Sequence, residues 1–480
     1  MAKISRATGQ PPLPVAFCAP GDRPAVLWAA ILASSMGFID SSVTAIAIPA
    51  IRSALHATLS QAQWISAAYL LALSALVLVG GAMGDRFGTA RVFVWGIWIF
   101  VAGSLACAFA VDASQLIAAR AAKGVGAALM VPGSMAIVSR AYPKAERGRA
   151  LGLWAAASTA TTALGPVLGG MLISWGGEAG WRMIFGLNLP LGLIAVWLIR
   201  GRIAADNGQP GVRVDIAGAG LATSGLGLLA YALTTTGPAF APGLAAALAL
   251  AGFLWWEGRA KAPMIRLGLF RNRAFALTNL VTFTLYFALN GVMFYLPMTA
   301  VSAWDVSALE VTAAFLPISL LIGVMSAPAG RLADRVGPGP LMAVGSALVA
   351  LAYGGLALGA EGDFWGRVVP LMGLAGVGLG LVVAPLTAAV MAEAADGEQG
   401  AASGINNAVA RVAGLIAVAL LGKLAAAAYG AGAPGFGLTS SDPAHLAATG
   451  AAFGVVAAVG AGAAALAALL ALFSRQDRRS

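Results

Sequence analysis

Charged side chains inside long apolar stretches are the residues of this chain whose types and spacing could do chemistry. Asp40 lies about fourteen residues into the apolar run 26–50, and Arg120 and Lys123 lie in the run 114–139. A charge at the middle of a bilayer costs ~2.5–3.5 kcal/mol even on lenient scales, so such groups face a protein or water-filled interior. A carboxyl group there can take up and release a proton as its surroundings become dry or wet. The sequence therefore predicts proton exchange at Asp40, tuned by Arg120.

Polar residues recur at helical spacing in four of the apolar runs, which predicts a polar stripe on each of four helices. The stripes are Gly37, Asp40, Ser41 and Thr44; Arg120 and Lys123; Asn279, Thr282, Tyr286 and Asn290; and Ser403, Asn407 and Arg411. Polar faces inside a membrane turn toward the protein interior, so one shared cavity is expected. Its expected lining residues are Thr44, Lys123, Tyr286, Asn290, Asn407 and Arg411.

Two alternatives to these site assignments stay open. Tyr286 and Asn290 could serve only to hydrogen-bond one helix to another. Asp40 and Arg120 could form a purely structural ion pair.

The elements that position these residues are predicted to be membrane-spanning helices. Apolar residues make up 60% of the 480 and charged residues 10%, against ~25% charged in ordinary soluble domains. Several runs exceed the ~20 apolar residues that a helix needs to cross the hydrocarbon, and the alternating pattern of an outer-membrane barrel is absent. The fourteen expected spans are 26–50, 62–83, 91–111, 114–139, 149–174, 182–200, 215–235, 239–256, 274–300, 307–329, 339–359, 364–391, 401–428 and 446–473.

Basic residues are distributed unevenly between the segments that connect the spans. If both termini are cytoplasmic, the cytoplasmic segments hold 22 of the 29 lysine and arginine residues and the outer segments hold three. This asymmetry follows the positive-inside rule and predicts cytoplasmic termini. The net charge of +10 is then mostly a feature of topology, and the scattered basic residues do not predict nucleic-acid binding. Usage rich in Ala, Gly and Arg indicates a bacterium, so an inner-membrane location is expected.

Two charged loops repeat one another along the chain. The stretches "GGAMGDRFGTAR" and "AGRLADRVGPG" place Asp85 and Asp334 249 residues apart. Shorter matches, "GVGAAL" with "GVGLGL" and "ERGRALG" with "EQGAASG", follow at an offset of 252. These matches predict a duplicated six-helix unit, with a bundle over 1–200, two inserted helices over 201–258 and a second bundle over 259–480. Parallel six-span halves place a substrate site at their interface near the bilayer midplane.

Five short motifs occur on this fourteen-span chain. They are "FIDSSVTAIAIPAI" in the first span, "GAMGDRFGTAR" after the second, "LIAARAAKGVGAAL" in the fourth, "TTALGPVLGG" in the fifth and "WRMIFGLNLP" at the sixth. Together they resemble the motifs of the 14-span drug:proton antiporters of the major facilitator superfamily, the EmrB/QacA-like group. The chain departs from the family pattern at Thr89 and Ala90, which replace an Arg-Lys pair, at Thr161, which replaces a Gly, and at Lys123, where Gln is usual.

The resemblance implies a conformational latch and an exporter motif. In the family the first loop's carboxylate meets the N-terminal end of a helix in the opposite half, here near Ala401, and by symmetry Asp334 would lie near Arg149. A carboxylate gains ~0.3–1 kcal/mol at such a position when exposed. The latch residues would be Gly81, Asp85, Arg86, Gly88, Gly330, Asp334, Arg335 and Gly337. The exporter-motif residues would be Gly165, Pro166, Gly169 and Gly170.

The resemblance also implies the major facilitator fold and proton-coupled efflux of drugs or other small molecules by alternating access. A monomer in the lipid bilayer, exchanging substrate for protons without a cofactor or a metal, is expected. A proton-coupled uptake symporter is the closest alternative, followed by a channel or a membrane enzyme. An enzyme is disfavoured because the two histidines, His56 and His445, lie in separate outer loops and no HExxH motif occurs.

The charges expected inside the bundle predict which substrates are favoured. One acid, Asp40, stands against four bases, Arg120, Lys123, Arg411 and Lys423. Neutral or anionic substrates are therefore expected over lipophilic cations. Glu310 is the second candidate for the proton carrier.

Overall fold

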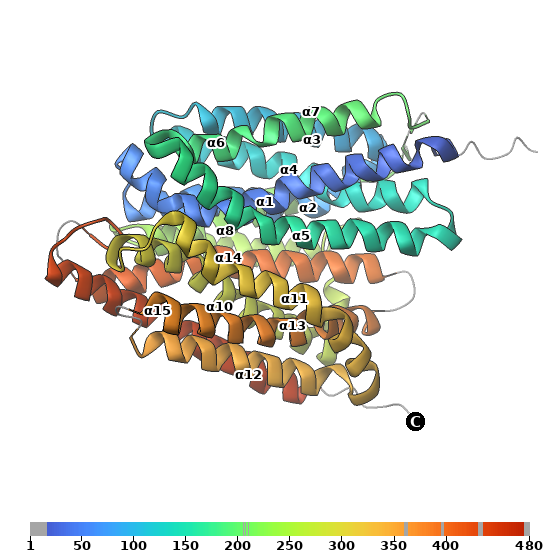
Figure 1. Ribbon diagram of the computed structural model, residues 1–480. Helices are drawn as coiled ribbons and strands as arrows, with labels where there is room; N and C mark the ends of the chain where they lie inside the picture. The colour runs from blue at the N-terminus through green and yellow to red at the C-terminus, as the bar shows by residue number, and fades with distance from the viewer. Residues whose placement is uncertain are drawn as a thin grey trace, which may run out of the picture.

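The computed structural model describes residues 17–474 except 205, 207, 210, 360–362, 395–397 and 431–434, and its described part is almost entirely helical (Figure 1). The α-helices are α1 (Arg23–Leu55), α2 (Leu59–Phe87), α3 (Thr89–Ala108), α4 (Ala113–Ala141), α5 (Lys144–Gly176), α6 (Gly180–Gly186), α7 (Asn188–Ile199), α8 (Ile216–Thr234), α9 (Phe240–Glu257), α10 (Arg273–Ala303), α11 (Ala308–Val336), α12 (Pro338–Ala357), α13 (Val369–Ala392), α14 (Gln399–Tyr429) and α15 (Pro443–Phe473). Short 3-10 turns precede α1, α6 and α10, and a π turn, Phe364–Val368, leads into α13.

The fourteen predicted spans are confirmed, because fourteen helical stretches of the described chain are long and apolar enough to cross a membrane. Helices α1, α2, α5 and α11 extend past the apolar runs by a turn or more, because these ends carry polar residues. The predicted span 182–200 is divided into α6 and α7 at Leu187. Pro190 explains the break, because it has no N–H to donate to the carbonyl of Gly186 one turn earlier.

The duplication extends to the backbone at equivalent positions. The two non-glycine residues with positive φ among those described, His56 and Asp305, lie 249 residues apart, and each lies in the short loop between two helices. Thr58 and Ser307 then cap α2 and α11 in the same way: each side chain accepts from the backbone N–H three residues on. Glu310 completes the second capping box by accepting from the Ser307 backbone N–H at 2.9 Å.

Glu310, the second candidate for the proton carrier, therefore lies exposed at the start of α11. Its carboxylate is held by the residues of its own helix cap. This position places it outside the interior of the bundle, contrary to the expectation that it could enter the cavity.

The helices form two bodies that face each other. In Figure 1, α1 to α7 form the upper body and α10 to α15 the lower one, with α8 and α9 behind the line where they meet. The pairs α1–α10, α2–α14 and α5–α11 make the contacts between the bodies. α8 packs against both α2 and α14. The division at residues 200 and 258 falls in the linkers on either side of α8 and α9 and remains a prediction.

The two ends of the bundle need names that do not assume a side of the membrane. The terminal end is where α1 begins and α15 ends, on the right of Figure 1. The distal end is where α1 is followed by α2, on the left. An even number of spans places the start of α1 and the end of α15 at the same end.

Candidate substrate and proton site

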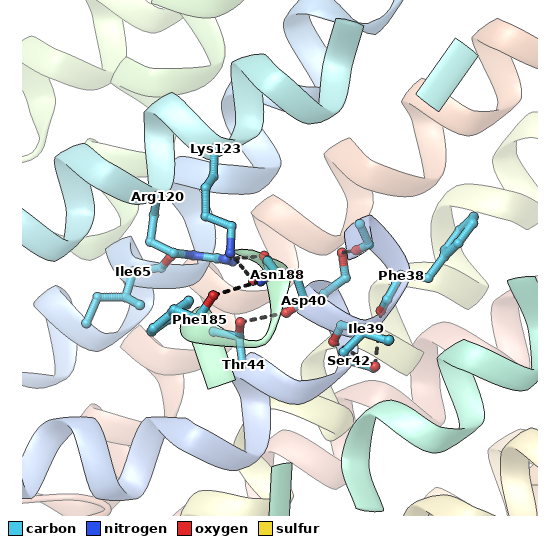
Figure 2. Close-up of polar contacts among 12 residues, drawn as sticks. Phe38, Ile39, Asp40, Ser42, Thr44, Ile65, Arg120, Lys123, Phe185 and Asn188 are labelled. Carbon is cyan, nitrogen blue, oxygen red and sulfur yellow. Dashed lines mark hydrogen bonds and ion pairs between the residues drawn. The ribbon is translucent and has the colours of Figure 1, made fainter. Parts of the chain in front are cut away.

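A buried ionic cluster joins α1 to α4 in the first half (Figure 2). Asp40 and Lys123 are 0% exposed and Arg120 is 1% exposed. The Arg120 guanidinium pairs with one carboxylate oxygen of Asp40, and the Lys123 ammonium pairs with the other. Both oxygens of the only acid in this cluster are therefore engaged by cations.

Contacts around the cluster hold each cation in place. Arg120 donates through Nε to the Ile65 carbonyl at 2.9 Å, and its guanidinium lies 4.5 Å from the centre of the Tyr69 ring. The Lys123 ammonium lies 4.6 Å from the Phe100 ring and 4.8 Å from the Phe185 ring. Carbonyl oxygens and aromatic faces stabilise cations that are removed from water. Protein groups therefore take the place of water around Arg120 and Lys123.

A glycine on α3, Gly103, lets that helix lie close to Lys123. A Cβ at Gly103 would stand 2.8 Å from Cγ of Lys123 and 3.0 Å from its backbone nitrogen. Any larger residue would push α3 away and open the pocket that holds the ammonium. The glycine therefore helps to bury Lys123, and the expected exposure of Lys123 to the cavity is not found.

A cavity of about 300 Å³ lies between the two halves beside this cluster. Its polar lining residues are Ser41, Ser42, Thr44, Ser66, Tyr69, Arg120, Thr162, Asn290 and Ser319. The rest of the lining is apolar and includes Leu289, Met293, Phe294 and Phe315 from the second half. A mostly apolar pocket with a few polar groups is the usual form of a small-molecule site.

Two of the six predicted lining residues, Thr44 and Asn290, line this cavity. Thr44 donates to the Asp40 carbonyl at 2.6 Å, and Asn290 donates to the Tyr286 carbonyl at 2.7 Å. Sequence reasoning missed Tyr69, whose side chain hydrogen-bonds to Ser41 of the predicted α1 stripe and whose ring lies against the Arg120 guanidinium. Its signal was the polar pair Ser66 and Tyr69, one helical turn apart in an apolar span.

The other predicted residues lie elsewhere. Arg411 is half-buried with an unpartnered Nε, and its electrostatic neighbours are Tyr69 and Tyr286. It therefore lies near the cavity, toward the terminal end of α14. Asn407 is exposed and donates to the Ser403 carbonyl at 3.0 Å. Lys423 is exposed as well, so it is not one of the interior bases.

Asn406, which sequence reasoning also missed, joins α14 to α10. Its Nδ2 donates to Asn279 at 3.2 Å and to Thr282 at 2.6 Å. The predicted stripe on α14 contained Asn407 in place of Asn406, because two adjacent asparagines fit a polar stripe equally well.

Hydrogen bonds between the halves close the distal side of the cavity. Gln63 of α2 donates to the Val418 carbonyl at 2.7 Å and to the Tyr295 hydroxyl at 3.0 Å. Nearer the distal end, Arg52 donates to the Phe436 carbonyl at 2.7 Å. These side-chain hydrogen bonds between described residues of the two halves lie toward the distal end. The structure is therefore closed toward the distal end.

The latch residues form two equivalent turns at the terminal end. Gly88 and Gly337 each join two helices as single residues with φ of 99° and 87°, a conformation that favours glycine. Asp85, Arg86, Asp334 and Arg335 are exposed, and Gly81 and Gly330 are half-buried. Among the residues that the structure describes, the side chains of Asp85 and Asp334 make no hydrogen bond or ion pair. Neither carboxylate is thus hydrogen-bonded to the start of α14 or of α5 in this conformation, and the latch remains a prediction.

An unpredicted residue, Asp206, braces the first of these turns. Its carboxylate accepts from both terminal nitrogens of Arg140, at 3.0 and 3.2 Å, and from the Ala90 backbone N–H at 3.3 Å. The Gln209 backbone N–H donates to the Asp85 carbonyl at 2.7 Å. The linker between α7 and α8 is thereby fixed to the start of α3 and the end of α4.

The exporter-motif residues are buried where α5 crosses other helices. A Cβ at Gly165 or Gly169 would collide with Ser42 or Val43 of α1. A Cβ at Gly170 would stand 2.7 Å from Thr312 of α11, and Pro166 lines the cavity. Small residues here allow α5 to pack closely against both halves.

Comparison with known proteins identifies the family. The model of the Major Facilitator Superfamily matches residues 30–418. A methylenomycin A resistance protein of Bacillus subtilis is 32% identical over 404 residues, 81% of this chain and 84% of the relative. A drug efflux pump, JefA, of Mycobacterium tuberculosis is 32% identical over 422 residues, 84% of this chain and 81% of the relative. The chain belongs to the major facilitator superfamily and is similar to its drug-efflux members.

Solved structures agree on the fold. A bacterial homologue of the human lysosomal transporter Spinster, in an inward-facing and unoccupied conformation, superimposes with a TM-score of 0.69 at 16% identity, covering 96% of this chain and all of that one. The chain is thus a multi-pass membrane transporter with the major facilitator fold. Membership in this family excludes the membrane enzyme considered above.

Proposed function

We propose that this protein exports small molecules from a bacterial cell in exchange for protons, by alternating access of the central cavity. The main support for this proposal is the ion pair of Asp40 with Arg120. Asp40 is a fully buried acid, and its partner Arg120 also lines the cavity. A change in the charge of Asp40 reaches the cavity directly through that guanidinium. The resistance and efflux relatives support export as the direction of transport.

In the proposed cycle, the described conformation is ready to receive substrate from the terminal side. Asp40 is ionised and holds both Arg120 and Lys123. After the halves rock and the distal side opens, a proton neutralises Asp40, and the two cations lose their common partner. Arg120 then moves, and the cavity that it lines releases substrate. Return to the terminal-open state and loss of the proton restore the cluster.

The coupling test compares purified variants in liposomes with an imposed pH gradient. Asp40→Asn keeps size and hydrogen bonding but cannot titrate, so uphill export should be abolished while substrate binding and counterflow are retained. Asp40→Glu should retain some export with a shifted pH profile. Glu310→Gln is the matched control, because it removes an exposed acid that caps its own helix. Uphill export by Asp40→Asn at the wild-type rate would contradict the proposal.

The proposed orientation places the terminal end in the cytoplasm of a cell with this protein in its inner membrane. Topology reporters fused after Gly208 and after Ser480 should both register as cytoplasmic, and a reporter fused after Val111 should register as external. A cytoplasmic signal at Val111 would reverse the orientation.

The two latch turns are proposed to close the terminal side in the opposite state. Asp85→Asn should shift the resting population toward the terminal-open state, because a neutral amide loses most of its attraction to a helix N-terminus. Labelling of a cysteine placed near the start of α14 would report this shift. Equal labelling rates in Asp85→Asn and the wild type would count against the latch.

A further inference from the structure

We propose that the exported molecules are uncharged, that each is held through a hydrogen-bond acceptor at Arg120, and that each exchange therefore moves net charge across the membrane. This inference rests on the proposed antiport and adds the class of substrate to it. Two observations support it: the charges around the cavity, and the terminal nitrogen Nη2 of Arg120, which makes no hydrogen bond with a described residue.

The cavity region carries an excess of positive charge. In the described part of the chain, the charged side chains in and beside it are Asp40, Arg120, Lys123 and Arg411, and the other titratable groups facing them are Tyr69, Tyr286 and Cys107. Three cations and one anion leave two positive charges in excess. Because both oxygens of Asp40 are engaged, no free carboxylate is presented to a cationic ligand. A permanent cation is therefore disfavoured.

An anion fits the charge of the cavity but not the direction of exchange. Protonation of Asp40 removes the single negative charge and makes the region still more positive. An anion would then bind more tightly to the protonated protein, and by reciprocity the anion would favour the bound proton. Proton and anion would travel together, as in a symporter. An antiporter requires that they compete, so an anionic substrate conflicts with the proposed exchange.

An uncharged acceptor satisfies both conditions, through the geometry of Arg120. Its Nε donates to the Ile65 carbonyl and its Nη1 to Asp40, while Nη2 makes no hydrogen bond with a described residue. Since Arg120 lines the cavity, the two N–H groups of Nη2 are available to a carbonyl or ether oxygen of a ligand.

The uncharged ligand then competes with the proton because protonation of Asp40 changes the position of the Arg120 guanidinium. Stacking on Tyr69 and the bond to Asp40 fix the plane of Arg120. When Asp40 is protonated, the charged partner is lost and Nη2 leaves its position. An uncharged ligand loses its hydrogen bond without any change in its own charge. Leu289, Met293 and Phe294 provide the apolar surface for the rest of such a molecule.

The charge moved in each cycle is the signature of this inference. Exchange of one proton for one uncharged molecule moves one positive charge inward. Exchange of one proton for one monovalent cation moves none. Currents recorded from proteoliposomes on a solid-supported membrane therefore separate the two substrate classes.

The test uses three fluorescent probes on one scaffold: 7-methoxycoumarin, which is uncharged, coumarin-3-carboxylate, and a coumarin with a trimethylammonium group. We expect the uncharged probe to bind at least about tenfold more tightly than the ammonium probe. Its binding should release protons into weakly buffered solution, and a concentration jump should produce a current in liposomes. The carboxylate probe should release no protons on binding.

A variant that alters the charge of the cavity should reverse the preference. Asn290→Asp adds an acid of nearly the same shape to the lining and should improve binding of the ammonium probe by about tenfold. Gln115→Glu makes the same amide-to-acid change at the exposed start of α4 and should leave all three affinities unchanged. Arg120→Lys, which keeps the charge but removes the free Nη2 group, should weaken the uncharged probe most.

The outcomes distinguish this inference from the function on which it rests. Tighter binding of the ammonium or the carboxylate probe to the wild type would overturn the substrate class, and proton release by that probe would leave antiport standing. Binding of the uncharged probe with neither proton release nor current would support the selectivity and contradict the antiport.

Discussion

The two halves of this transporter differ most at equivalent positions in their cores. At the offset of 252 residues, Met372 and Ala375 of the second half take the places of Arg120 and Lys123, and all four are buried. Near the counterpart of Asp40 stands an uncharged residue, Asn290. One half thus carries a buried ionic cluster and the other an apolar core at the same points of the fold. In the proposed antiport, the response to protons therefore belongs to the first half.

Energetics explain why the duplication was not kept at these positions. Removal of an ion from water costs several kcal/mol, and the protein recovers it only with good geometry and further hydrogen bonds. The first half supplies these through the Ile65 carbonyl and the rings of Tyr69, Phe100 and Phe185. The second half packs methionine and alanine instead and bears no such cost.

The largest expected effect comes from replacing Arg120 of the first half with methionine, the residue at the equivalent position of the second half. Arg120→Met leaves Asp40 with a single partner, so we expect a loss of ~3–5 kcal/mol in stability and no uphill export. The thermal midpoint in detergent and export in liposomes measure the two effects. Asp40→Leu combined with Arg120→Met leaves Lys123 buried without its carboxylate partner, so this double variant should be less stable still and give no export. Recovery of export in the double variant would refute the role of the cluster in coupling.

The reverse substitution tests whether the second half tolerates a charge. Met372→Arg places an unpaired cation among buried apolar residues, which costs ~2.5–3.5 kcal/mol. Lower yield and a lower thermal midpoint are expected, while the control Met372→Leu should cost under ~1.5 kcal/mol. An unchanged midpoint in Met372→Arg would mean that water reaches this core as well.

The two latch turns offer a smaller comparison. Gly88→Ala and Gly337→Ala each force a side chain into a positive-φ conformation, at about 1–3 kcal/mol. Around Gly337 the space is open, whereas a methyl group at Gly88 would collide with the Asp206 carbonyl. Gly88→Ala should therefore lower the free energy of unfolding more than Gly337→Ala. Equal effects would show that the linker moves aside without cost.

The smallest expected effect concerns the brace itself, in which Asp206 accepts from Arg140. Because Arg140 is 45% exposed, Asp206→Asn should cost no more than ~1 kcal/mol in global stability. Amide hydrogen exchange across 200–215 should nevertheless become faster, since the linker loses its anchor on α3 and α4. Asp22→Asn, at an exposed pair with Arg202, is the control and should leave the exchange at 206–209 unchanged.

Apolar run lengths and charge placement were enough to predict the fourteen spans, and the repeated loops were enough to predict the duplication. The pairing of Asp40 with Arg120 could be expected because buried charges in a membrane need partners. Lys123 was assigned to the cavity because helical spacing gives a face but not the distance to a neighbouring helix. The closeness of α3, which Gly103 permits, buries that lysine.

Other features required knowledge of the packing or a signal that was overlooked. Glu310 was considered as a proton carrier although Ser307 stands three residues before it, the spacing of a capping box. Asp206 lies in a polar linker, where no periodicity marks one residue above another. Its role depends on a turn more than a hundred residues earlier, and a single sequence does not reveal such contacts.

The position of α8 bears on how lipophilic molecules reach the cavity from the bilayer. Trp64 of α2 donates to Thr234 of α8 at 3.0 Å, and Ala67, Ala230 and Leu415 of α2, α8 and α14 pack in one cluster. The inserted pair thus covers the line of contact between α2 and α14 from the lipid. No described helix covers the line between α5 and α11 in this way. The α5–α11 side of the contact between the halves is therefore the side that the bilayer reaches directly.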